Sequence, residues 1–198
     1  MDSKLEPRVL PVRYKLTAQD NAEFRYLFNK MNALLQREQL SIRVLDEPEY
    51  SYTGTLESVP DVPQGRNIVV SDLTLFCADP YKYKDAVTVN GTNTVDILMD
   101  TFYDTYPQEI TITPTNSTST LTIRNGNKEI KLVDGSFVGG QPVVIRFGDD
   151  ITVTNQNGSM TDKIALHSDL ENFTLNKGDT VQFVEGGQIS IKVSQVML

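Results

Sequence analysis

The sequence has no tryptophan, and it contains one cysteine, Cys77, and one histidine, His167. A single cysteine excludes an intrachain disulfide, and its place in a strand pattern predicts a small, buried, apolar residue. A single histidine makes His167 the only imidazole for any Ser-His-Asp or Cys-His arrangement. Because no nucleophile motif accompanies it, we expect a structural or surface histidine rather than a catalytic one.

The usual motifs of metal and phosphate sites are also missing from the sequence. It contains no EF-hand loop, HExxH, Cys/His cluster or glycine-rich phosphate loop. Asp149 and Asp150 could contact a calcium ion, but adjacent strand residues point to opposite faces, so a turn is their expected use. With 26 acidic residues, some pair of carboxylates will be close by chance, so two-carboxylate hydrolysis has no specific support. We therefore predict no catalytic residue, metal or cofactor, and an enzyme is the weakest hypothesis.

Long apolar runs and clusters of basic residues are absent as well. No run approaches the roughly 18 residues needed to cross a bilayer, and the opening MDSKLEPRVLP lacks the layout of a secretory signal. We expect assembly in a cytosol and no membrane partner. The net charge is −8 and the pI about 4.7, which disfavours nucleic-acid binding. An acidic surface is compatible with a lumen through which DNA slides without sticking.

The composition is that of a folded chain, with 39% hydrophobic and 22% charged residues among 198. That length suits one large or two small domains. In the first part, alternation predicts a strand over residues 8–17. Asp20 and Glu23 form a capping-box pattern before a helix over residues 22–37. The apolar residues of that helix recur at helical spacing: Phe24, Leu27, Phe28, Met31, Leu34 and Leu35.

Three further strands are predicted at residues 41–45, 50–58 and 67–78, and a proline-bounded loop, Pro60 to Gly65, joins the last two. The order β-α-β-β-β indicates an α+β domain, in which the helix lies on one face of an antiparallel sheet. We expect the helical stripe to pack on this sheet rather than to bind a partner.

From Asp85 onward the pattern is all-β, and the chain as a whole is expected to be mainly β. Hairpin turns are predicted wherever Asn-Gly, Gly-Gly or a similar pair occurs. A two-residue loop at Asn125-Gly126 would place Leu121 opposite Ile130. A three-residue loop, 185–187, would pair residues 181–183 with 189–191, placing Phe183 opposite Ile189. Short strands at this spacing indicate a sandwich of two antiparallel sheets. The turn signals are Asn90-Gly91, Asn125-Gly126, Asp134-Gly135, Gly139-Gly140, Asn157-Gly158, Lys177-Gly178 and Gly186-Gly187.

The stretch from Ser71 to Lys84, SDLTLFCADPYKYK, lies where the two patterns meet. It begins as a strand, and Asp79-Pro80 ends it because proline has no N–H for a sheet. We interpret it as the last strand of a first domain, 1–84, and as a latch onto a second, 85–198. An ordinary strand that ends in an Asp-Pro turn is the alternative.

Phe102, Tyr103 and Tyr106 form the dense aromatic cluster of the second part. Such a cluster could stack against a sugar ring, although sugar sites often use tryptophan. Part of an inter-sheet core or a subunit contact is the more ordinary use. The stretch from Thr111 to Thr122 is rich in Ser and Thr, and we expect loop and exposed strand edge there.

Several of these motifs together resemble the distal tail protein (Dit) family of long-tailed (siphovirus) phages. Members close their first domain with a phenylalanine strand and a D-P-Y-x-Y element, here Phe76, Asp79, Pro80, Tyr81 and Tyr83. They also carry a helix followed by a "DEP…Y" turn, here Asp46 to Tyr52. In the second part, VVIRFGDDITVT and HSDLENFTLNKGDTVQF resemble the family's galectin-like β-sandwich.

The resemblance implies a structural protein of the virion tail tip and no active site. It implies a hexameric ring that joins the tail tube to the tail hub or tail-associated lysin, and that can carry receptor-binding proteins or side fibres. Family members have several strands before the one predicted at residues 8–17. The sequence begins almost at that strand, as a short variant or a truncated chain would. The rival hypothesis is a carbohydrate-binding sandwich that acts on host surface glycans.

Overall fold

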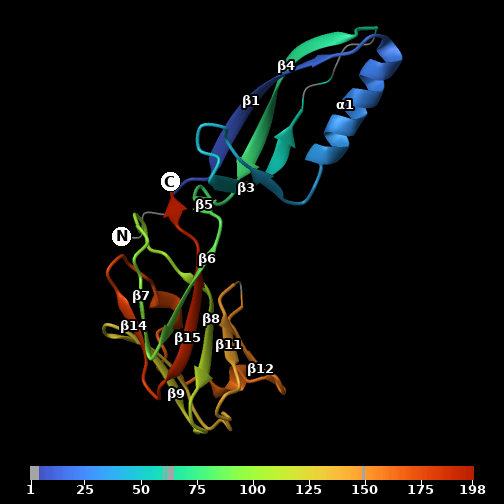
Figure 1. Ribbon diagram of the computed structural model, residues 1–198. Coiled ribbons are helices and arrows are strands. Elements are labelled where there is room, and N and C mark those ends of the chain that lie inside the picture. Colours follow the sequence, from blue (N-terminus) through green and yellow to red (C-terminus); the bar gives the residue numbers. More distant parts are fainter. Residues whose placement is uncertain (1–4, 60, 62–64, 149) are drawn as a thin grey trace. The chain divides into compact units, whose positions relative to one another are not determined.

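The computed structural model describes residues 5–59, 61, 65–148 and 150–198 (Figure 1). The chain divides into two compact units. The first ends at Tyr83 and also includes Leu198, and the second is Lys84–Met197. The predicted loop over residues 60–65 and the Asp149-Asp150 turn lie partly outside the described residues.

The first unit is an antiparallel sheet with one helix. Its strands are in the order β1-β4-β3, and both β2 and β5 pair with β3. The elements begin with the β-α-β-β-β predicted for this segment, and a short strand that was not predicted, β5, follows them. The strand expected at residues 41–45 is shorter and begins earlier. The bounds are β1 (Arg8–Thr17), α1 (Asn21–Leu35), β2 (Leu40–Ile42), β3 (Tyr50–Ser58), β4 (Ile68–Cys77) and β5 (Lys82–Lys84).

Strands β1 and β4 form the longest pairing of this sheet. Their register runs from Arg8 opposite Cys77 to Thr17 opposite Ile68, and Figure 1 shows the two strands side by side. On one face of β4, three side chains are at most 6% exposed: Leu73, Leu75 and Cys77. This is the inward face that alternation predicts.

The start of helix α1 is fixed by side chains, as the capping pattern predicts. Asp20 Oδ1 accepts a hydrogen bond from the Glu23 N–H at 2.8 Å. Glu23 Oε2 accepts one from the N–H of Gln19 at 2.7 Å, one residue earlier than in the usual capping box. The helix ends at Leu35, two residues before the predicted end.

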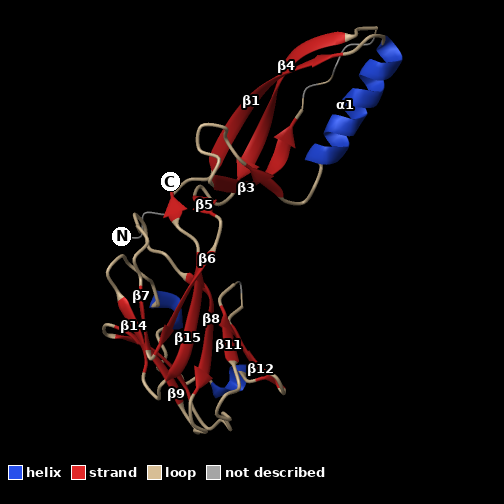
Figure 2. Cartoon of the chain, viewed as in Figure 1, coloured by secondary structure: helices blue, strands red, loops and turns tan. Residues whose placement is uncertain are grey.

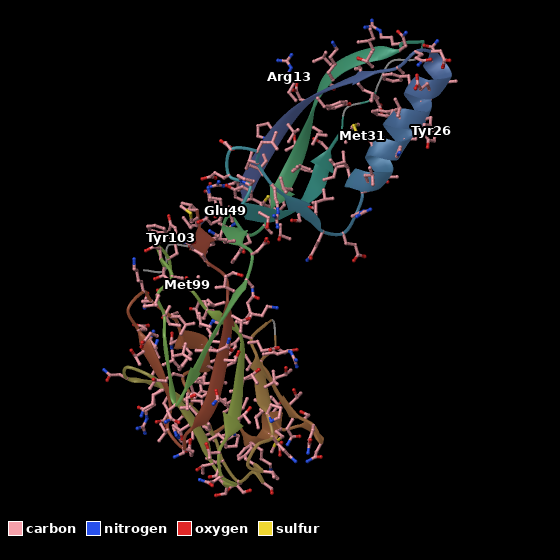
Figure 3. All side chains as sticks on the ribbon, in the orientation of Figure 1. Arg13, Tyr26, Met31, Glu49, Met99 and Tyr103 are labelled. Carbon is pink, nitrogen blue, oxygen red and sulfur yellow. The ribbon has the colours of Figure 1, made fainter. Side chains whose placement is uncertain are left out.

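The apolar stripe of α1 packs tightly only near its N-terminus. Phe24 is fully buried and its ring stacks on Phe28 with centroids 6.3 Å apart. Further along, Leu34 is 51% exposed. In Figure 3, Met31 projects toward the strands and Tyr26 lies on the opposite side of the helix. The C-terminal half of the stripe therefore remains only partly covered.

The second unit consists of two antiparallel sheets, with 3-10 turns as the only helical segments among its described residues (Figure 2). One sheet has the strand order β10-β9-β14-β7 and the other β13-β12-β11-β8-β15-β6. The bounds are β6 (Val87–Thr92), β7 (Thr94–Asp96), β8 (Pro107–Pro114), β9 (Leu121–Asn125), β10 (Lys128–Leu132), β11 (Val143–Arg146), β12 (Thr152–Asn155), β13 (Gly158–Ser159), β14 (Thr180–Phe183), β15 (Gly187–Val193) and β16 (Val196–Met197), with 3-10 turns at Thr161–Lys163 and Leu170–Asn172.

Both sheets of the second unit contribute to one hydrophobic core. Leu121, Ile123 and Val181 come from the first sheet, and Ile110 and Ile191 from the second; each is at most 1% exposed. Apolar side chains that interdigitate between two sheets in this way form a β-sandwich.

The β9–β10 hairpin forms with a register different from the predicted one. Ile130 lies opposite Ile123, and Leu132 lies opposite Leu121, so the two-residue loop is residues 126–127. Gly126 supplies the positive φ, 59°, as the first loop residue, which is the type II′ arrangement rather than the expected type I′. The register moves by two residues, so every predicted face is kept.

The hairpin predicted at residues 185–187 is wrong. β14 pairs with β7 and β9, whereas β15 pairs with β6 and β8. The chain crosses from one sheet to the other at this point. Phe183 and Ile189 are both buried, but they enter the core from opposite sheets. Alternation predicts which side chains face a core, and it does not say which sheet carries them.

Two other local predictions are wrong. Asn90-Gly91 lies inside β6, and the turn that follows is at Asn93, where φ is 64°. Asparagine tolerates this conformation without help from glycine. The stretch Thr111 to Thr122 contains the predicted loop, at residues 115–120, but not the predicted exposed strand edge. Its first four residues belong to β8, which lies between β11 and β15, and Thr122 in β9 is 4% exposed.

Candidate functional site

The D-P-Y-x-Y element after β4 is organised around the carboxylate of Asp79. Asp79 Oδ1 accepts a hydrogen bond from the Tyr81 N–H at 3.0 Å. Its Oδ2 accepts one from the Tyr83 hydroxyl at 2.6 Å. The first bond is an Asx-turn, which suits a residue that precedes proline. Phe76 of β4 lies three residues before Asp79, opposite Val9 of β1 and Thr55 of β3. The assignment of these residues to a domain junction stays a prediction.

The same contacts change the chemistry of Tyr83. Burial raises the pKa of the Tyr83 phenol, and the hydrogen bond to Asp79 raises it further. Both effects disfavour the phenolate beside a carboxylate. Tyr83 is therefore a neutral hydrogen-bond donor that holds the turn, and it has no role as a base.

A buried cation that was not predicted from the sequence lies next to this turn. The Lys82 side chain is 8% exposed and forms an ion pair with Glu47. Its Nζ lies 5.6 Å from the ring centroid of Tyr50. The hydrogen bond to Glu47 raises the pKa of Lys82. Alternation along the strand places the Lys82 side chain on the face opposite to Tyr81 and Tyr83, and this was the only feature of the sequence that could have indicated its burial. Nothing in the sequence paired it with the DEPEY turn.

Arg8 makes a second cationic contact on an aromatic ring in this unit. Its Nη1 donates to the Tyr52 hydroxyl at 2.6 Å, and its guanidinium lies 5.1 Å from the centroid of the same ring. Cys77, opposite Arg8 in the sheet, is free and fully buried. Burial raises the pKa of its thiol, so the side chain packs as a small apolar group. Hydrogen bonds and cation–π contacts give this cluster a structural role.

The aromatic cluster of the second unit lies at the surface and not in the inter-sheet core. Phe102 is 65% exposed, Tyr103 37% and Tyr106 47%. The connecting segment is held by Thr105, which is fully buried and donates to the Tyr103 carbonyl oxygen at 2.9 Å. The core interpretation of these aromatic residues is therefore wrong. Their use as a glycan or subunit contact stays a prediction.

His167 lies on the surface, as expected. Its side chain is 66% exposed, and Nε2 is 3.9 Å from Glu129 Oε1. Among the residues that the structure describes, no three His, Cys, Asp or Glu side chains are grouped to hold a metal ion. Within the same described part, no helix is long and apolar enough to cross a membrane.

An open groove of about 480 Å³ lies in the first unit between the C-terminal half of α1 and the end of β3. Phe28, Asn32 and Leu35 line it from the helix, and residues 55–58 line it from the strand. Arg37, just past the helix, closes the lining on that side. The sequence does not predict this groove, because the whole apolar stripe of the helix was expected to pack on the sheet.

Comparison with known proteins gives matches at the level of structure. No protein-family profile and no curated protein sequence matches the chain. The crystal structure of SPP1 Dit (gp 19.1), described as a paradigm of the hub adsorption apparatus in phages that infect Gram-positive bacteria, matches with a TM-score of 0.78 and 20% identity. That match covers 98% of this chain and 81% of the SPP1 protein.

Two structures of the phage P2 baseplate in its activated conformation, with Ca and with Sr, match more distantly. Each has a TM-score of 0.50 and covers 95% of this chain and 79% of the baseplate chain, with 12% and 11% identity. These three solved structures are of a phage hub protein and of a phage baseplate. The resemblance to the Dit family that the sequence predicts is confirmed at the level of the fold, and the chain has a Dit-like fold.

Proposed function

We propose that the chain is a structural protein of a phage tail tip. The observation that carries this proposal is the likeness to SPP1 Dit, which extends over 98% of the chain and so includes both compact units. A likeness restricted to the β-sandwich would be weak evidence for function, because β-sandwiches occur in proteins with many unrelated functions.

In the finer form of the proposal, residues 1–84 are a ring domain and residues 85–198 a galectin-like sandwich. Six copies form a ring between the tail tube and the tail hub or tail-associated lysin, with receptor-binding proteins or side fibres as further partners. Exposed apolar side chains support a subunit contact: Val9, Ile68 and Val70 are each at least 50% exposed. The net charge of −8 suits a lumen that DNA crosses without binding. Assembly would take place in the host cytoplasm.

Labelling of whole virions tests the location. Antibodies against the chain, applied to particles of the phage that encodes it, are expected to mark the end of the tail away from the capsid. Antibodies depleted with the purified chain serve as the control and should leave the tail unmarked. The proposal would be contradicted if only the capsid were labelled. It would also be contradicted if particles whose tail tips are accessible to antibodies were not labelled at all.

A second candidate is glycan binding by the sandwich, and the exposure of the aromatic cluster favours it. Tyr103 and Tyr106 present ring surface to solvent, which is what stacking on a sugar requires. A glycan array of host cell-wall sugars is the test. The signal should fall with Tyr103→Ala or Tyr106→Ala and stay unchanged with Tyr26→Ala, a matched change at an exposed tyrosine of the other unit. Silence on the whole array would exclude this candidate.

A further inference from the structure

We propose that the groove between α1 and β3 binds the free C-terminal tail of a partner protein as an added β-strand. This inference does not depend on the ring or on a tail-tip location. It begins with the open edge of β3. Thr55, Leu56 and Ser58 pair with β4 on one side, with an irregularity at residue 57. Two other strands pair with β3: β2 reaches only as far as Gly54, and Lys82 of β5 contacts Tyr50 at the opposite end of β3. The other side of residues 55–58 therefore carries no strand in the part of the chain that the structure describes.

The open edge is short and has a closed end. β2 pairs with the same side of β3 only up to Leu40 opposite Gly54. From there the chain leads back through residues 36–39 to the end of α1. An incoming strand could therefore face residues 55–58, a length of about 13 Å at the usual rise per residue, and it would then meet Leu40. The site fits the end of a chain better than the middle of a long strand.

The direction of pairing selects which end of the partner enters. β2 runs antiparallel to β3, and antiparallel pairing is the more stable kind. A strand that continues the line of β2 in the same direction places its last residue next to Leu40. The residue at that position, opposite Thr55, would be the C-terminal residue of the partner protein.

The lining of the groove matches such a tail chemically. Phe28, Leu35 and Leu56 offer an apolar floor for alternate side chains of the strand. An added strand has a second backbone edge, which here faces the helix. Asn32 lines the groove, and its Oδ1 is buried without a hydrogen-bond partner among the described residues. A turn of this side chain toward the groove would let Oδ1 accept from a backbone N–H on that edge. Buried acceptors are normally satisfied.

Arg37 offers a positive charge for the terminal carboxylate of such a tail. Arg37 lies at the closed end, between the last residue of α1 and the first of β2, and it has no ion-pair partner in the described part of the chain. The C-terminus of α1 carries a partial negative charge, about half an elementary charge, that opposes an anion. The lining also contains the carboxylates of Glu57 and Asp61, which lie two and six residues beyond Thr55 along the chain. Arg37 supplies a full positive charge at the closed end and a fork of donors that fits a carboxylate, so an anion is favoured at that end of the groove alone.

A peptide library tests this proposal with the full chain. The probes are immobilised six-residue peptides whose last four positions are randomised, prepared both as free carboxylates and as C-terminal amides. We expect a subset with apolar residues at alternate positions to bind, and its amides to bind about tenfold more weakly or worse, as the loss of a charge-assisted bond implies. Arg37→Ala should give the same loss, whereas Arg13→Ala, at an exposed arginine of β1, should not.

The location of binding is read from amide shifts in nuclear magnetic resonance spectra of the chain titrated with the best peptide. The largest changes are expected in residues 55–58 and 32–37. Three results would each overturn the proposal: equal binding of acids and amides, equal affinity of the two arginine variants, or shifts confined to other strands. Absence of any peptide that binds more tightly than about 1 mM, a weak affinity on the usual scale, would do so too.

Discussion

Single side chains around Asp79 show how the end of β4 is held. One carboxylate accepts from the backbone of Tyr81 and from the hydroxyl of Tyr83, so a short turn is fixed without regular structure. The motif was visible in the sequence as D-P-Y-x-Y. Its bond to the Tyr81 N–H follows from the preference of aspartate for bonding two residues ahead, whereas the bond from the Tyr83 hydroxyl, four residues ahead, does not.

Replacement of Tyr83 by phenylalanine removes the bond to Asp79 and should lower the free energy of unfolding by about 1 kcal/mol at neutral pH. The raised pKa of Tyr83 means that the folded chain favours the neutral phenol. Its contribution is present below the unfolded pKa of about 10 and is lost as the pH rises through the folded value. Urea unfolding followed by circular dichroism at pH 8 and pH 11 should show the difference between wild type and variant shrink. Tyr26→Phe is the control, and a pH-independent difference would contradict this reasoning.

Loss of the negative partner of Lys82 should be destabilising because the ammonium is almost completely buried. For Glu47→Gln we expect the free energy of unfolding to fall by about 1–2 kcal/mol, which is at the low end for a charge-assisted bond. The value is low because the Glu47 side chain is 42% exposed and solvent screens its charge. Glu38→Gln, an exposed carboxylate in the same unit, should change the free energy of unfolding by less than about 0.5 kcal/mol. Equal effects of the two changes would show that the ion pair is not stabilising.

At the scale of elements, local patterns predicted well what is local. The capping residues and the spacing of apolar residues placed α1 within two residues of its actual bounds, and alternation placed β1 and the inward side chains of β4. Sheet membership could not be predicted in this way. β14 and β15 alternate as a hairpin would, yet they belong to different sheets, because pairing depends on contacts distant in sequence.

The cap of α1 offers a direct test at this scale. Asp20→Ala should remove the bond to the Glu23 N–H and lower the free energy of unfolding of the first unit by about 1 kcal/mol. Asn29→Ala, at an exposed interior position of the same helix, should leave stability equal or slightly higher, since alanine is the better helix former. Thermal denaturation followed by circular dichroism measures both. A milder effect at Asp20 than at Asn29 would exclude the capping interpretation.

The crossing between the two sheets of the second unit depends on Gly187. An added Cβ would lie 2.1 Å from the Thr113 carbonyl oxygen, and φ is 146°. Gly187→Ala should therefore cost about 2–5 kcal/mol, from overpacking and backbone strain together. At Gly126 φ is also positive but the space is open, so Gly126→Ala should cost only about 1–2 kcal/mol. Chemical denaturation that ranks the two variants in the reverse order would contradict the crossing described for this segment.

At the scale of the whole molecule, resemblance in sequence and resemblance in structure agree. Motifs in both parts of the chain, the strongest of them in the first part, suggested the Dit family, and the fold matches SPP1 Dit over nearly the whole chain. The groove beside β3 and the Lys82–Glu47 pair were not predictable, because each depends on how separate elements meet. The exposure of the aromatic cluster likewise depends on tertiary packing, which periodicity does not contain.

The mass of the purified chain in solution tests the central claim most directly. Light scattering behind a sizing column, followed by electron microscopy, is expected to show particles of about six times the chain mass of 22.2 kDa that form six-fold rings with an open centre. If the chain alone is monomeric, the same measurement with the tail-tube protein added is expected to yield the ring. A single-chain mass at high concentration, both alone and with the tail-tube protein, would contradict a ring-forming tail protein.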